Sequence, residues 1–217
     1  MRPCPTCEKP RSLCFPATSR VLLESGASIS MSQLRFGDKL RTLGTNGETT
    51  ASEVIAFLHK ETHTQAEFYK LETSAGNTIT LSPQHLIFRK QNFSSPISAV
   101  FASEVNLGNL LYVSNGSDLQ CQEVTRITMV TEIGVYAPLT TQGTMFVDGV
   151  LVSCYATWPS HDAAHLAMAP LRAACAIARA WKQLTSLQGW SLWDVSPETD
   201  GFSWYAMALM ALTNVFT

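Results

Sequence analysis

Short apolar runs separated by turn residues fill the chain from residue 14 to about residue 158, and this alternation limits the fold more than any other feature. The runs RVLL, EVIAFL, TITL and HLIF are four to six residues long, and Asn-Gly and Ala-Gly-Asn stand between neighbouring runs at residues 46–47 and 75–77. Runs of this length bounded by turn residues are typical of strands joined by hairpins. The sequence therefore predicts a mainly β domain over residues 14–158.

Beyond residue 158 the residue pattern becomes helical. The segment AAHLAMAPLRAACAIARAWKQL is rich in Ala, Leu and Arg, with apolar residues at helical spacing, and this predicts a helix. A loop that contains Gly189, Pro197 and Gly201 follows, and a second helix is predicted from about Ser203 to Val215. We therefore expect a short α-helical appendage over residues 159–217.

The β-rich part contains an internal repeat. Residues 53–86 resemble residues 123–155, since each segment opens with Glu-Val and continues through an aromatic residue and a Leu to a Gly-containing turn and a β-rich run. Such a repeat predicts two related β subdomains around a pseudo-two-fold axis. His85 and Cys154 would then end equivalent strands and meet near that axis.

The composition excludes several classes of protein. Of 217 residues, 46% are hydrophobic and 15% are charged, with 15 Lys and Arg against 17 Asp and Glu for a formal net charge of -2. A chain this apolar does not stay disordered, and a chain without a basic surface does not bind nucleic acid by neutralising phosphates. No apolar run reaches the roughly 20 residues of a membrane-spanning helix, and residues 1–13 lack the apolar stretch of a signal peptide. We expect a soluble chain that does not bind nucleic acid.

The six cysteines lack the spacing of a disulfide scaffold. Cys4 and Cys7 make a single CxxC motif with no second pair to complete a zinc site, so we interpret it as part of a terminal tail. His161 and His165 have the spacing of a helical zinc pair, but the Glu of a metalloprotease motif is missing. We expect neither a metal ion nor a cofactor.

Three short motifs hold the residue types of a cysteine-dependent reaction. Cys14 precedes Phe-Pro at the entry to the β domain, Ser82-Pro-Gln-His85 follows a predicted strand, and Ser153-Cys154-Tyr-Ala comes late in the domain. Each motif alone fits a packed cysteine or a structural histidine. Together they offer a nucleophile, a proton shuttle and a supporting group.

Six segments carry a family resemblance: CFPATSRVLLESG, FGDKL, SEVIAF, TLSPQHL, YAPLTTQGT and VSCYA. In order and spacing they resemble the autoprocessing C-terminal domain of hedgehog proteins, which belongs to the Hint superfamily shared with inteins. AHLAMAPLR and GFSWYAMAL are similar to the sterol-recognition region that follows the Hint core in hedgehog proteins and that inteins lack. The resemblance implies a Hint fold, with a pseudo-two-fold β core over residues 14–158 and a sterol-recognition-like region over residues 159–217.

The resemblance also implies a single-turnover self-cleavage in two steps. The Cys14 thiol attacks the carbonyl of Leu13, so that the upstream polypeptide, of which residues 1–13 are present, moves from nitrogen to sulfur as a thioester. The 3-hydroxyl of cholesterol then attacks the thioester and leaves as an ester of the upstream polypeptide. In this scheme His85 protonates the departing nitrogen, Ser82 serves the same step, and Cys154 can pair with or modulate the nucleophile.

Three positions depart from the family pattern. Ser82 replaces a Thr, Leu13 replaces a Gly before the nucleophile, and His59 replaces an Asp thought to activate the sterol hydroxyl. An imidazole, with an ordinary pKa of about 6.5, can act as a base near neutral pH, so we expect His59 to be the base of the second step. The change adds bulk and removes a fixed negative charge. Water or another nucleophile is therefore an alternative to sterol, and a non-catalytic lipid-binding or interaction relic of a longer protein is a second alternative.

The aromatic residues of the appendage allow two interpretations, a sterol groove or the core of the appendage. The sterol contacts expected from the resemblance are Trp181, Trp204, Tyr205 and Leu209. The last three lie on one face of the second predicted helix, which is the arrangement of a helix that lies on a membrane surface. The expected partners are thus a sterol, the chain's own upstream polypeptide and a membrane surface. The resemblance implies the secretory pathway, from the endoplasmic reticulum to the outside of the cell.

Overall fold

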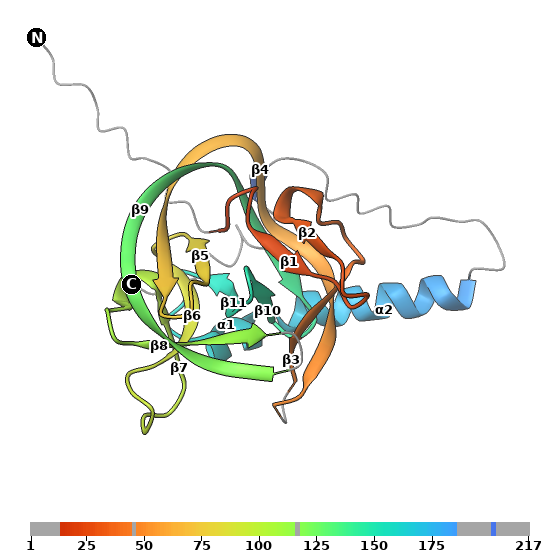
Figure 1. Ribbon diagram of the computed structural model, residues 1–217. Helices are drawn as coiled ribbons and strands as arrows, with labels where there is room; N and C mark the ends of the chain where they lie inside the picture. The colour runs from red at the N-terminus through yellow and green to blue at the C-terminus, as the bar shows by residue number, and fades with distance from the viewer. Residues whose placement is uncertain (1–13, 45–46, 116–117, 186–200, 203–217) are drawn as a thin grey trace, which may run out of the picture.

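The computed structural model describes residues 14–44, 47–115, 118–185 and 201–202, and strands dominate these ranges (Figure 1). The strands are β1 (Arg20–Leu22), β2 (Ser28–Ser30), β3 (Lys39–Leu43), β4 (Thr49–Thr73), β5 (Thr78–Leu81), β6 (His85–Lys90), β7 (Ser98–Phe101), β8 (Leu110–Asn115), β9 (Asp118–Thr140), β10 (Thr144–Val147), β11 (Val150–Ala156) and β12 (Gly201–Phe202). Short 3-10 helices, η1 (Met31–Gln33) and η2 (Ala102–Glu104), precede β3 and β8. The predicted mainly β fold is confirmed.

The two longest strands, β4 and β9, form the frame of the molecule. They pair antiparallel from Val54 opposite Thr140 to Thr73 opposite Val124, with several register shifts on the way. Figure 1 shows the two strands arching together over one side of the body. Bulges bend a strand and increase its twist, so the shifts allow this long pair to curve around a single core.

The predicted pseudo-two-fold repeat is visible in the element order and in matching hydrogen bonds. Elements η1 and β3–β6 are followed by η2 and β8–β11, with long strands at equivalent places. In the first copy the Gly37 N–H donates to the Val54 carbonyl at 2.9 Å. In the second copy the Gly108 N–H donates to the Val124 carbonyl at the same distance of 2.9 Å. The sequence repeat therefore encodes two copies of one β unit.

One detail of the repeat differs from the expectation. His85 opens β6, whereas Cys154 lies near the end of β11, so the two residues do not occupy equivalent ends of equivalent strands. The strands β6 and β11 pair antiparallel, with Ala156 opposite His85, and this pairing brings the start of one strand beside the end of the other. Antiparallel pairing, rather than equivalence in the repeat, brings the two positions together.

The core lies between the curved β4–β9 pair and the shorter strands. Its largest fully buried side chains include Phe15, Phe68, Tyr136 and Tyr155, which come from the entry segment, β4, β9 and β11. Side chains of a strand alternate between its two faces, and β11 is buried on both faces at its first six residues. The entry segment is therefore part of the core and is held by it.

Two helices, α1 (His161–Ala167) and α2 (Ala169–Thr185), stand where the sequence predicted one. The Ser160 hydroxyl accepts a hydrogen bond from the Ala163 N–H at 3.1 Å and caps α1, as short polar residues do at helix N-termini. Pro170 accounts for the break, because a proline has no N–H to donate to the carbonyl four residues before it, and a proline is tolerated in the first turn of a new helix. Neither helix in the described ranges is long and apolar enough to cross a membrane. The second predicted helix, 203–215, lies outside the described residues.

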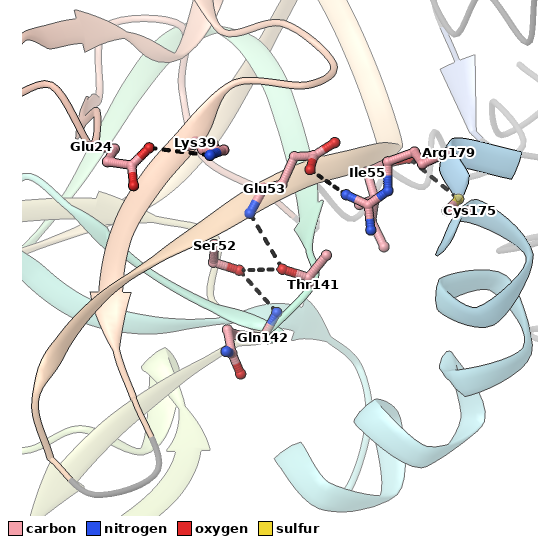
Figure 2. Close-up of polar contacts among 9 residues, drawn as sticks. All are labelled: Glu24, Lys39, Ser52, Glu53, Ile55, Thr141, Gln142, Cys175 and Arg179. Atoms are coloured by element: carbon pink, nitrogen blue, oxygen red, sulfur yellow. Dashed lines mark hydrogen bonds and ion pairs between the residues drawn. The ribbon is translucent and has the colours of Figure 1, made fainter. Parts of the chain in front are cut away.

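The helix α2 is attached to β4 through side chains (Figure 2). Arg179 forms an ion pair with Glu53, and the Cys175 thiol lies 3.7 Å from the carbonyl oxygen of Ile55. Leu171 and Cys175 also pack against the core. Figure 1 shows α2 extending away from the strands beyond this attachment. The appendage is thus joined to the strand that also carries His59.

The C-terminal region meets β4 at a second place. Gly201, which we expected in a loop, belongs to β12, and it pairs with Lys60 while Phe202 pairs with His59. This pairing and the contacts of α2 with Glu53 and Ile55 all lie within a few residues of His59 on β4. The appendage therefore flanks the part of β4 that contributes to the site described next.

Candidate active site

The Cys14 thiol is buried at the entry to the β domain, where two segments hold its backbone. Phe15 and Tyr136 of β9 exchange two backbone hydrogen bonds of 2.9 Å. The Cys14 carbonyl accepts a third bond of 2.9 Å from the Ser82 N–H, in the turn before β6. Cys14 itself is 0% exposed. Cys14 is therefore fixed between β9 and the Ser82 turn.

Gly134 allows the entry segment to lie against β9. Its φ is +86°, and a Cβ at this position would lie 2.8 Å from the Ala17 Cβ and 3.2 Å from the Ala17 nitrogen. The Ala17 N–H also donates to the Ile133 carbonyl at 3.0 Å. A side chain at position 134 would therefore force the entry segment away from β9.

We expect Gly134→Ala to lower the free energy of unfolding by about 1–3 kcal/mol and to slow any reaction of Cys14. Gly37→Ala is the matched control, because Gly37 has a φ of +88° and no atom within 4 Å of its would-be Cβ. Gly37→Ala has the same backbone strain of a positive φ, but its new methyl group displaces no neighbouring atom. Denaturant unfolding and the rate of thiol-induced cleavage measure both effects. Equal cleavage rates in the two variants would show that contact with Gly134 does not position Cys14.

His59 contacts Cys14 directly. Its Nδ1 lies 3.4 Å from the Cys14 Sγ, and its Nε2 lies 2.9 Å from Glu61 Oε1. His59 and Glu61 are two residues apart on β4, and residues at this spacing share one face of a strand. A carboxylate accepts hydrogen bonds only, so Nε2 carries the proton and Nδ1 of the neutral ring is an acceptor for the thiol. Cys14, His59 and Glu61 thus form a line of thiol, imidazole and carboxylate.

His85 packs against the entry segment. Its Nε2 is 2.8 Å from the Ser153 carbonyl oxygen, and its ring packs on the Phe15 ring with centroids 4.3 Å apart. A carbonyl oxygen can only accept, so Nε2 donates and Nδ1 carries the lone pair of the neutral ring. His85 is 0% exposed, and burial keeps this ring in place beside Phe15, the residue after Cys14.

Ser82 connects Cys14 to His85 through its backbone. Its N–H donates to the Cys14 carbonyl at 2.9 Å, and its carbonyl accepts from the His85 N–H at 3.1 Å. The Ser82 hydroxyl is buried and has no hydrogen-bond partner among the described residues. Burying a hydroxyl in this way is costly unless a partner is supplied during function. Leu13, the residue on the acyl side of Cys14, lies outside the described residues.

Cys154 is a buried thiol of a different kind. Its Sγ lies 3.4 Å from the Thr140 hydroxyl, and its N–H donates to the Gly143 carbonyl at 2.8 Å. Burial raises the pKa of the Cys154 thiol to about 11, and the Thr140 hydrogen bonds offset only part of this shift. Cys154 is therefore protonated at neutral pH, when Cys14 is the thiol with an imidazole beside it. Its supporting role stays a prediction.

The remaining candidates do not join this site within the described residues. His161 Nδ1 lies 3.0 Å from the Ser153 hydroxyl, and His165 Nδ1 lies 2.9 Å from the Tyr155 hydroxyl. Burial is the largest cause that lowers the pKa of both histidines, and it lowers the pKa of His165 to about 4, so both rings are neutral at pH 7. Their hydrogen bonds with Ser153 and Tyr155 attach α1 to β11. Trp181 lies in α2. Five other candidates lie outside the described residues: Cys4, Cys7, Trp204, Tyr205 and Leu209.

Glu61 is a site residue that the sequence analysis missed. The signal was its two-residue spacing from His59 inside a segment expected to be a strand. The hydrogen bond to His59 lowers the pKa of Glu61, although the larger cause is a hydrogen bond with Thr64. Glu61 is therefore ionised at neutral pH. This residue gives the site a fixed negative charge two positions after the place where the family pattern has an Asp.

Comparison with known proteins identifies the family. The Hint module family matches residues 8–217. "Protein hedgehog" of Drosophila persimilis is 35% identical over 202 residues, which are 90% of this chain and 42% of that protein. "Sonic hedgehog protein" of Xenopus laevis is 37% identical over 164 residues, which are 73% of this chain and 37% of that protein. The chain thus spans about two fifths of the length of these relatives.

Solved structures of inteins have the same fold. A DnaB intein from Synechocystis sp. PCC 6803 superposes with a TM-score of 0.53 at 15% identity, covering 66% of this chain and 98% of the intein. An intein from a hyperthermophile superposes with a TM-score of 0.54 at 12% identity, covering 64% of this chain and 98% of the intein. Its fold, its match to the family over residues 8–217 and its similarity to hedgehog proteins show that the chain belongs to the Hint module family, as a Hint domain of the hedgehog-like type.

Proposed function

We propose that this Hint domain cleaves the polypeptide chain at its own Leu13-Cys14 bond and transfers the upstream part to the hydroxyl of a sterol such as cholesterol. The observation that carries the proposal is the 3.4 Å contact between Cys14 Sγ and His59 Nδ1. A thiol becomes a good nucleophile when a base can take its proton. The contact supports His59 as a base for Cys14, the cysteine that the family resemblance marks as the nucleophile.

In the first step the Cys14 sulfur attacks the Leu13 carbonyl carbon, and a tetrahedral intermediate forms. The bond from that carbon to the Cys14 nitrogen then breaks, and the nitrogen needs a proton to leave as an amine. His85 is the proposed donor: its bond to the Ser153 carbonyl fixes the ring, and a proton taken up from solvent at Nδ1 is the one that is transferred. The products are a thioester on Cys14 and a free α-amino group. Ser82 is proposed to serve this step with its hydroxyl.

In the second step an alcohol oxygen attacks the thioester carbonyl. His59 is the proposed base: it takes the hydroxyl proton, the bond from carbon to sulfur breaks, and Cys14 leaves as a thiolate that is protonated in turn. The identity of 35% with a hedgehog protein over most of the chain supports a sterol as the alcohol. The pairing of Phe202 with His59 supports a role for the C-terminal region at this step. Trp181, Trp204, Tyr205 and Leu209 remain the proposed sterol contacts.

Water is the second candidate acceptor. A line of thiol, imidazole and carboxylate is the arrangement with which cysteine hydrolases activate both the thiol and the incoming water. The contacts of His59 with Cys14 and Glu61 favour this alternative, because the same imidazole can deprotonate water as readily as an alcohol. The upstream polypeptide would then end in a free carboxylate rather than an ester.

The resemblance extends the proposal to the place of action. The hedgehog relatives support processing in the secretory pathway, between the endoplasmic reticulum and the outside of the cell, at a sterol-containing membrane surface. The upstream polypeptide is then the substrate, the sterol is a co-substrate, and the reaction proceeds without a metal ion or cofactor.

A fusion protein tests the proposal. A reporter placed ahead of residue 1 is purified with the intact domain, and its mass is followed without additions, with dithiothreitol and with cholesterol in detergent. We expect release by dithiothreitol and release by cholesterol with a gain of the sterol's mass. Release as a free acid in buffer alone would select water as the acceptor. An intact fusion under all three conditions would contradict the proposed self-cleavage and favour a binding relic.

A further inference from the structure

Glu61 is the residue of this site that neither the sequence motifs nor the family resemblance assigns a role. We infer that Glu61 is a positioning residue: its carboxylate holds His59 in the orientation and tautomer in which Nδ1 takes the proton of the Cys14 thiol. The inference rests on the proposed function, and it places His59 in the first step as well as in the second. Cys14, His59 and Glu61 would act as one unit in thioester formation.

The backbone of β4 sets the geometry of this unit. Glu61 lies opposite Val135 and Gln65 lies opposite Ile133, so β4 uses four positions where β9 uses two. A bulge of this kind re-aims side chains and is common beside active sites. His59 and Glu61 precede the bulge and keep the regular two-residue spacing, so both project from the same face of β4. The register shift between β4 and β9 begins directly after Glu61.

Thr64, inside the bulge, fixes the carboxylate. A hydrogen bond with Thr64 is the largest cause that lowers the pKa of Glu61, and the hydrogen bond with His59 is the next. Glu61 is only partly buried, with a side chain 33% exposed, whereas the side chain of His59 is 6% exposed. The carboxylate therefore remains charged at neutral pH and presents an oxygen to Nε2 of a ring that is almost completely enclosed.

The proton balance of the step follows from these contacts. The Cys14 S–H proton moves to His59 Nδ1 while the sulfur forms a bond to the Leu13 carbonyl carbon. His59 is then a cation between the reacting centre and the Glu61 carboxylate, which is a favourable arrangement of charges. His85 takes up a proton from solvent at Nδ1, and the bond from the carbonyl carbon to the Cys14 nitrogen breaks as that nitrogen gains this proton. His59 then passes its proton to solvent, so that both imidazoles are neutral again before the second step and no net proton is gained or lost.

Glu61→Ala and Glu61→Gln in the reporter fusion test this role. Ala removes the hydrogen-bond acceptor, so we expect release by dithiothreitol to slow by about 10- to 100-fold. Gln keeps an oxygen that can accept from Nε2 but lacks the charge, so we expect an intermediate rate. Glu67→Gln is the matched control, because Glu67 is an exposed glutamate of the same strand, and this variant should release its reporter at the wild-type rate.

The tautomer of His59 is a second measurement, because it would not change if Glu61 had only a structural role. In the intact fusion, nitrogen-15 NMR of the imidazole should show a protonated Nε2 in the wild type and in Glu61→Gln, and a mixture of tautomers in Glu61→Ala. The His59 signals are assigned by their absence in His59→Gln. Glu61→Ala with the wild-type tautomer and the wild-type rate would overturn the inference. A wild-type fusion that never cleaves would instead contradict the proposed function, and the tautomer measurement would still test Glu61.

Discussion

A fusion with Cys14→Ala is expected to stay intact with dithiothreitol and with cholesterol. The substitution removes the sulfur that lies 3.4 Å from His59 Nδ1, and alanine brings no hydroxyl or thiol in its place. Release should therefore fall below detection rather than slow by a modest factor. The mass of the fusion after prolonged incubation measures this result.

The loss of reporter release in Cys14→Ala must come from the missing thiol rather than from unfolding of the domain. Cys14 is 0% exposed, and removing one buried sulfur leaves only a small cavity, so thermal unfolding should shift by a few degrees at most. Cys121→Ala is the matched control, because Cys121 is a partly buried free cysteine of β9 outside the site. Reporter released from Cys14→Ala, or lost equally in Cys121→Ala, would refute Cys14 as the nucleophile.

The second large effect is expected from His85→Ala, which should slow release by dithiothreitol by about 10²- to 10⁴-fold. The departing nitrogen of Cys14 would lack its proton donor, so the tetrahedral intermediate would return to the amide. The thioester, once formed, needs no proton on this nitrogen. The defect should therefore appear in the first step, as a low rate of thiol-induced release in single-turnover measurements.

His85→Gln separates catalysis from packing. Truncation to Ala leaves the Ser153 carbonyl without its donor and opens a cavity beside Phe15, which destabilises the fold. Gln fills most of this space and can donate to Ser153, yet it does not exchange protons near neutral pH. Its rate should match that of His85→Ala, whereas His63→Gln, at an exposed position of β4, should match the wild type. A wild-type rate in His85→Gln would show that His85 serves only the structure.

The sequence alone was enough to predict the mainly β fold and the internal repeat, and the family resemblance marked the motifs around Cys14 and His85. Alternation of apolar residues and the turn residues between them are local features, and each short strand obeys them independently. The motif around His85 was visible for the same reason, because it occupies one turn next to one strand. The change from strands to helices between Ala156 and His161 also follows from local composition.

The tertiary structure alone decided the contacts within the site. His59 and Cys14 are 45 residues apart, and their contact depends on how β4, β9 and the entry segment align. That alignment includes bulges, and a shift of one residue in a strand turns its side chains to the opposite face. No local pattern reveals a bulge, so the sequence offered His59 only as a base for the sterol and did not mark Glu61 at all. The sequence contains the residues of the site, but the long-range register of the sheet determines which of these residues contact one another.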